Sequence, residues 1–147
     1  MAAIMESIEI SRRPEDVFTY LSDLARHGEW QEQIVSVKVD TDGPTRVGSR
    51  ATEVRRAGGR ELTGTYEMTE VDSPRSFAFK GIDGPVRPVG RGTLEPVGDG
   101  TRLTLELDFE GHGLVGKLMA PLARSQARKQ VPKDQQRLKE RLESGAA

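Results

Sequence analysis

The chain has 147 residues, no cysteine, two histidines and a formal net charge of −1, with 22 Lys and Arg against 23 Asp and Glu. A domain of this length buries about 68–70% of the surface that its unfolded chain exposes, so a single core is expected over residues 1–147. The lack of cysteine excludes disulfides and thiol chemistry, and two histidines give no convincing metal cluster. The balanced charge argues against nucleic acid as the main partner, because phosphate binding needs a concentrated positive field.

The hydropathy pattern favours a protein of the cytoplasm. The first ten residues lack a basic start and a long apolar run, as a secretory signal would require. No segment approaches the ~20 apolar residues of a membrane-spanning helix, so no membrane span is expected.

The chain begins with a predicted strand over residues 4–10, where apolar and polar residues alternate loosely. Pro14, Glu15 and Asp16 then favour a helix start, since proline suits the first turn and acids suit the positive end of the helix dipole. A second short helix is expected to end near Gly28. The only tryptophan, Trp30, follows at once, and it is either a packing residue or one end of a ligand site.

Six further strands are predicted from period-two patterns and turn residues. Gly58-Gly59 predicts a hairpin because glycine accepts the positive φ of tight turns. Pro85 and Pro88 cannot donate hydrogen bonds to a neighbouring strand, so residues 85–92 are expected at an edge, a bulge or the mouth of the sheet rather than at its centre. The segments concerned are residues 34–39, 47–55, 61–71, 76–80, 91–97 and 101–110.

The strand over residues 101–110 has the clearest pattern of the chain. Four large apolar residues, Leu103, Leu105, Leu107 and Phe109, alternate with polar ones. One face is therefore expected to be dry and the other wet, as in a curved antiparallel sheet that is covered on its concave side only.

A long amphipathic helix is predicted from Leu114 to Leu142. In its first half Val115, Leu118, Met119 and Leu122 form one apolar stripe, whereas at about 100° per residue the apolar residues of its second half centre roughly 160° away. Pro132 lies between the two halves, and an interior proline loses a hydrogen bond and clashes with the preceding turn. A kink or break is therefore expected near Val131.

The second half of this helix is also basic. Between residues 124 and 143 there are seven Lys or Arg and three Asp or Glu, a local charge of +4. A protein partner, an anionic membrane or RNA could bind such a face, but no aromatic residue anchors it, so a solvated helix surface is the preferred interpretation.

Several stretches together resemble the START-like, Bet v 1-like superfamily, and within it the polyketide cyclase/dehydrase and lipid-transport group. They are the run from Ile8 to Phe18, the segment from Asp23 to Trp30, the pair Val47-Gly48, and the run from Glu95 to Leu103 that leads to a glycine-rich helix start. The resemblance implies an α+β helix-grip fold, in which a seven-stranded curved antiparallel sheet surrounds the long C-terminal helix and two short helices follow the first strand. It also implies an apolar pocket between sheet and helix.

The expected function is therefore the binding of a small or medium apolar ligand, as a carrier or sensor, without a cofactor or metal. Each wall residue is individually more typical of plain core, and only the resemblance favours a shared ligand site. Oligomeric state is left open between monomer and homodimer. The predicted ligand-binding residues are Trp30, Tyr66, Met68, Phe77, Phe79, Leu105, Leu107, Phe109, Leu118, Met119 and Leu122.

Two alternatives remain: a cyclase or dehydratase-type enzyme that uses the same cavity, and an interaction module that uses the basic part of the last helix. No nucleophile-elbow, phosphate-loop or dinucleotide motif occurs, so no catalytic residue is assigned. His112 could be a general base because its ordinary pKa is near 6.5, but its position between two glycines is more typical of a solvent-exposed loop residue. Other polar candidates near a pocket are Glu53, Arg60, Tyr66 and Arg91.

Overall fold

The computed structural model describes residues 3–145 and 147. Two helical segments follow its first strand, as the sequence predicts. Helix α1 spans Pro14–Ser22 and the 3-10 helix η1 spans Leu24–Glu29. Pro14 lies in the first turn of α1, where its missing N–H would have no partner in the helix, and Glu15 and Asp16 share that turn. Helix α2 closes the chain at Gly113–Ser144.

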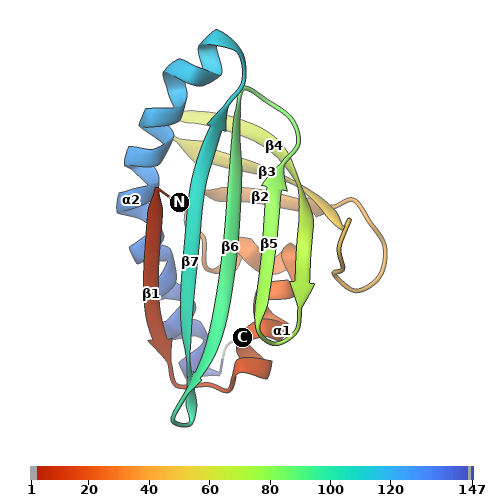
Figure 1. The fold of residues 1–147 in the computed structure, drawn as a ribbon, viewed down its shortest axis with the longest axis vertical. Helices are drawn as coiled ribbons and strands as arrows, with labels where there is room; N and C mark the ends of the chain where they lie inside the picture. The colour runs from red at the N-terminus through yellow and green to blue at the C-terminus, as the bar shows by residue number, and fades with distance from the viewer. Residues whose placement is uncertain (1–2, 146) are drawn as a thin grey trace.

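Seven strands form one antiparallel sheet in the order β1-β7-β6-β5-β4-β3-β2. The sheet curves so that β2, β3 and β4 pass behind β5, β6 and β7, and α2 lies along its open side (Figure 1). This arrangement confirms the predicted helix-grip fold. The strands are β1 Ile4–Ile10, β2 Ile34–Val39, β3 Arg50–Ala57, β4 Arg60–Asp72, β5 Ser76–Gly81, β6 Val86–Val97 and β7 Gly100–Gly111.

The segment with two prolines forms neither an edge nor a bulge, so these two of its three predicted placements are wrong. Strand β6 lies between β5 and β7, and its register to both neighbours is unbroken. Pro88 pairs with Phe109 of β7 but lies one residue beyond the last pair with β5, which joins Val89 to Lys80. The sheet can therefore accept this proline, because β5 no longer needs a donor at that position.

The predicted break near Val131 is also wrong. Helix α2 runs without interruption through 32 residues and contains both Pro121 and Pro132. Its second half is held firmly to the rest of the chain: Leu138 is 0% exposed and Leu142 is 1% exposed. Packing of these leucines keeps the helix continuous despite the missing hydrogen bond at Pro132.

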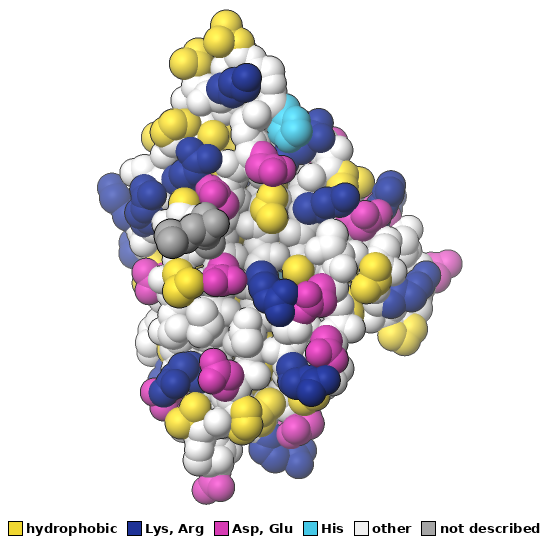
Figure 2. All heavy atoms as spheres, viewed as in Figure 1, with side chains coloured by type: hydrophobic (Ala, Val, Ile, Leu, Met, Phe, Trp, Pro, Cys, Tyr) yellow, Lys and Arg dark blue, Asp and Glu magenta, His cyan; other side chains and the backbone are white. Residues whose placement is uncertain are grey.

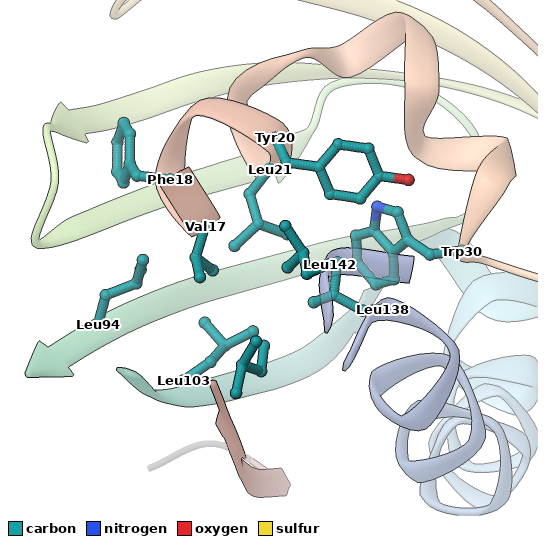
Figure 3. Packing of buried hydrophobic residues seen from close by; sticks show 10 residues of the cluster. Val17, Phe18, Tyr20, Leu21, Trp30, Leu94, Leu103, Leu138 and Leu142 are labelled. Carbon is teal, nitrogen blue, oxygen red and sulfur yellow. The ribbon is translucent and has the colours of Figure 1, made fainter. Parts of the chain in front are cut away.

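The main core lies at the end of the molecule where α1 crosses the last turns of α2 (Figure 3). Val17, Phe18 and Leu21 of α1 pack there against Leu138 and Leu142. Leu94 of β6 and Leu103 of β7 supply the sheet side of the same cluster. Most of the fully buried apolar side chains thus lie at one end of the molecule.

Candidate ligand cavity

A cavity of about 400 Å³ lies between the concave face of the sheet and α2. It begins beside the main core, where Phe18, Leu21 and Trp30 border it. At its other end two lining residues are half exposed, Leu62 at 52% and Leu122 at 57%. The mouth therefore lies between the β3–β4 hairpin and the first half of α2.

Ten of the eleven residues that the sequence predicts as ligand-binding line this cavity. Trp30 does so while also belonging to the main core, so its two proposed roles are not exclusive. The strand residues come from the inner face of β4, β5 and β7, as the period-two pattern predicts. The ten residues are Trp30, Tyr66, Met68, Phe77, Phe79, Leu105, Leu107, Phe109, Met119 and Leu122.

Leu118 is the exception, because it is 72% exposed and does not border the cavity. The first half of α2 approaches the sheet through small residues instead: Gly116, Ala120 and Ala127 are buried. A Cβ added to Gly116 would overlap the carbonyl oxygen of Pro85, so a larger residue does not fit. Because the side of α2 with small residues lies close to the sheet, the stripe of large apolar residues faces outward.

The outward stripe leaves apolar side chains on the surface where α2 begins. Leu114 is 76% exposed and Val115 is 59% exposed. Figure 2 shows hydrophobic side chains gathered at this tip of the molecule. Only Met119 and Leu122, on the flank of the stripe, reach the cavity wall.

Two phenylalanine rings form the aromatic wall and lie across glycines of the neighbouring strand. Phe77 pairs with Gly92, and Phe79 pairs with Gly90. A Cβ on Gly92 would overlap the Phe77 ring, and one on Gly90 would overlap the Phe79 ring. The glycines therefore allow the rings to lie flat against β6, which leaves the space above them open.

Gly92→Ala should lower the free energy of unfolding by about 1–3 kcal/mol, because the new methyl group would overlap the Phe77 ring. Gly64→Ala in β4 is the matched control, since its Cβ would meet only the Asp83 carboxylate at 4.0 Å. The control should change stability by no more than about 0.5 kcal/mol. Equal urea midpoints for the two variants would contradict this packing.

Another part of the cavity lining is polar and centres on an ion pair. The Arg55 Nε lies 2.6 Å from the Glu53 Oε1, and the guanidinium also donates to the side chain of Gln31. The charge of Arg55 acts on the titration of three more lining residues, His27, Tyr66 and Asp134. We call these lining residues the polar end of the cavity. They come from η1 and the residues just after it, from β3 and β4, and from the middle of α2.

Burial shifts the pKa values of two groups in this cluster. Desolvation lowers the pKa of His27, which keeps the imidazole neutral at neutral pH, and its Nε2 lies 2.7 Å from the Leu21 carbonyl oxygen. Desolvation raises the pKa of the Asp134 carboxyl. The Asp134 Oδ1 accepts hydrogen bonds from the Gln130 side chain at 2.9 Å and from the Glu32 backbone N–H at 3.2 Å.

Asp134→Asn should stabilise the protein at neutral pH, since an amide oxygen can keep both hydrogen bonds without a buried charge. A carboxyl whose pKa is higher in the folded state takes up a proton on folding. Its penalty is therefore present above the folded pKa and disappears as the pH falls through that value towards 3.8. Urea melts across this range should show the gain shrinking, and a gain that grows in acid would contradict the assignment.

Tyr66 is the most buried polar residue of the sheet wall. It is 7% exposed, and desolvation raises the pKa of its phenol. Its hydroxyl has no hydrogen-bond partner among residues 3–145 and 147. The indole Nε1 of Trp30 is buried in the same way, without a partner in this described range.

Three other polar candidates from the sequence do not form part of this cluster. Arg91 borders the cavity, but it alternates with Gly90 and Gly92, and its guanidinium binds Glu70 at 2.7 Å. Arg60 and His112 are exposed and do not line the cavity; His112 is the N-cap residue of α2. Within the described residues, no three Asp, Glu or His side chains could hold a metal ion together.

The basic half of α2 is largely used in contacts within the chain. Four of its seven cations form ion pairs with acidic side chains at 2.7–3.1 Å. Three of these pairs join α2 to other elements, namely Arg124 to Asp108, Arg137 to Glu32 and Arg141 to Glu29.

The described helices include none that is long and apolar enough to cross a membrane.

The curved sheet that grips a terminal helix around an internal cavity is a START-like helix-grip fold. The chain belongs to the polyketide cyclase/dehydrase and lipid transport family, whose model matches residues 1–143. The uncharacterized protein Rv1546 from Mycobacterium tuberculosis is 27% identical to it over 126 residues, which are 85% of this chain and 88% of that protein.

Two solved structures share the fold. TTHA0849 from Thermus thermophilus superposes with a TM-score of 0.81 at 24% identity, over 98% of this chain and 99% of that one. A START superfamily protein from Mycobacterium smegmatis gives a TM-score of 0.78 at 16% identity, over 96% and 97%. At these identities the likeness concerns the fold alone.

Proposed function

We propose that this protein binds a small or medium apolar molecule in the cavity and acts as a carrier or sensor. The observation that carries the proposal is a cavity of about 400 Å³ with one wall of aromatic and aliphatic side chains. Apolar enclosure with a few placed polar groups is the usual chemistry of small-molecule sites. Membership of a family described by lipid transport supports the same function.

Native mass spectrometry of freshly purified protein tests whether an apolar molecule is retained. A second measurement uses the neutral fluorescent probe N-phenyl-1-naphthylamine, which should bind saturably at one site. Met119→Trp should weaken probe binding, because Met119 lines the cavity near its mouth. Leu118→Trp, on the next residue of the same helix but outside the cavity, should leave it unchanged. Unsaturable binding, or equal effects of the two variants, would contradict the proposal.

The second candidate is a cyclase or dehydratase-type enzyme that acts in the same cavity. The family description includes these activities, and the polar end offers groups that can exchange protons. Asp134 has a raised pKa and Tyr66 has an unpartnered hydroxyl within the described residues, which are properties of general acids and bases. Conversion of a linear polyketide-like compound, lost in Asp134→Asn, would favour the enzyme, whereas unchanged recovery of the compound favours the carrier.

A further inference from the structure

Tyr66 borders the cavity, and its hydroxyl is buried without a hydrogen-bond partner among the described residues. Tyr66 faces Ala51 across the β3–β4 ladder, and Glu53 and Gly64 are the next inward pair. Gly64 has no side chain, and a Cβ placed on it would have a single contact, at 4.0 Å. Because Gly64 has no side chain, space remains beside Tyr66. A larger residue at position 64 would occupy that space.

A buried hydroxyl without a partner is unfavourable, since desolvating a polar group and leaving it unpaired lowers stability. The Tyr66 oxygen is in this state with respect to the described residues, although the residue is 93% buried, the complement of its 7% exposure. The other tyrosine, Tyr20, has its hydroxyl bonded to Glu29 at 2.9 Å and to Arg141 at 3.0 Å. The contrast indicates that the partner of Tyr66 comes from outside the chain.

The charges around the polar end determine which partner fits. The charged lining residues are the carboxylates Glu53, Asp83, Glu106 and Asp134 and the guanidiniums Arg55 and Arg91, of which Arg91 is paired with Glu70 at 2.7 Å. Arg55 is already neutralised by Glu53 at 2.6 Å, so it offers no free positive charge to a ligand. An anionic head group would meet net negative charge and lose its hydration, which disfavours it strongly.

We propose that the Tyr66 hydroxyl is the hydrogen-bonding anchor for a neutral oxygen on an otherwise apolar ligand. A ketone, a phenol or an alcohol satisfies this chemistry, whereas a carboxylate or a phosphate does not. The apolar body of the ligand then lies over Phe77 and Phe79, with its oxygen at Tyr66. This inference rests on the proposed function, since it names the ligand class of the same cavity.

Three probes of one shape test the inference: naphthalene, 2-naphthol and 2-naphthoate. Their binding is measured by displacement of N-phenyl-1-naphthylamine at neutral pH, where 2-naphthol is neutral and 2-naphthoate is charged. Wild type should bind 2-naphthol about 2- to 12-fold more tightly than naphthalene, the gain of one net hydrogen bond. It should bind 2-naphthoate more weakly than 2-naphthol.

Tyr66→Phe should bind naphthalene and 2-naphthol equally, because only the anchoring oxygen is removed. The ligand-free variant should melt at a temperature no lower than wild type, since an unpaired buried hydroxyl is lost. Tyr20→Phe is the matched control: Tyr20 does not line the cavity, so the preference for 2-naphthol should persist.

Two results would overturn the inference alone: a preference for 2-naphthol that survives in Tyr66→Phe, or 2-naphthoate bound at least as tightly as 2-naphthol. In both cases naphthalene still binds wild type, so the cavity keeps its proposed function. If naphthalene and 2-naphthol both fail to displace the probe from wild type, the proposed function is contradicted together with the inference.

Discussion

Leu138→Ala should lower the free energy of unfolding by about 2–5 kcal/mol, the range for removing a fully buried leucine side chain. Leu138 is 0% exposed and packs against α1 and the sheet in the main core. A cavity left there cannot collapse easily, because Val17, Leu103 and Leu142 around it are also fully buried. Urea melts followed by far-UV circular dichroism measure the difference.

Leu118→Ala on the same helix provides the control and should change stability by no more than about 0.5 kcal/mol. Leu118 is 72% exposed, so alanine there removes few contacts and has a high helix propensity. A loss at Leu118 that equals the loss at Leu138 would mean that the first half of α2 packs as tightly as the second.

Pro132→Ala should stabilise the protein by about 2 kcal/mol. In a continuous helix the proline removes the hydrogen bond to the carbonyl of Arg128 and clashes with that turn, at a cost of about 3 kcal/mol. Alanine gives back roughly 0.4–1 kcal/mol by making the unfolded chain more flexible. Pro132 is exposed, so the substitution removes little packing.

Pro14→Ala is the matched control, because Pro14 lies at the start of α1 where a proline is compatible with the helix. It should be neutral or slightly destabilising in the same urea melts. Replacement by alanine is therefore expected to stabilise the protein at Pro132 and to be neutral or slightly destabilising at Pro14. A neutral or destabilising result at Pro132 would contradict the continuous helix.

The sequence predicts the sheet well because strand patterns are local. Leu103, Leu105 and Leu107 alternate with polar residues, and this period alone places them on one face. The resemblance to a helix-grip family then assigns that face to the cavity side. Both steps need only short segments and the order of elements, and the structure agrees with both.

The helix is harder to predict because its packing depends on distance to the sheet. The phase difference between its two halves is present in the sequence, but it does not say which half is buried. Gly116 and Ala120 decide this, since small residues permit close approach and turn Leu118 outward. Hydrophobicity favours the large residues, so pattern analysis wrongly places Leu118 on the cavity side, although Met119 and Leu122 do reach it.

The polar end of the cavity has no local signature at all. His27, Arg55 and Asp134 come from η1, β3 and α2, and only the curvature of the sheet brings them together. The alternation of residues 51–57 on β3 could have suggested that Glu53 and Arg55 share a face. It could not have shown that Asp134 lies opposite them.

The main core and the cavity occupy different parts of the molecule. This separation affects which residues can be replaced without destabilising the fold. Residues that hold the fold, such as Leu103 and Leu142, are fully buried at one end. Lining residues such as Leu105 and Leu107 are only half buried, so their replacement disturbs fewer contacts. Descendants of one ancestral chain could therefore reshape the cavity by exchanging these lining residues, with a smaller loss of folding free energy than the same changes in the main core would cause. Under the proposed function, laboratory evolution of ligand specificity would start from the β7 lining positions for the same reason.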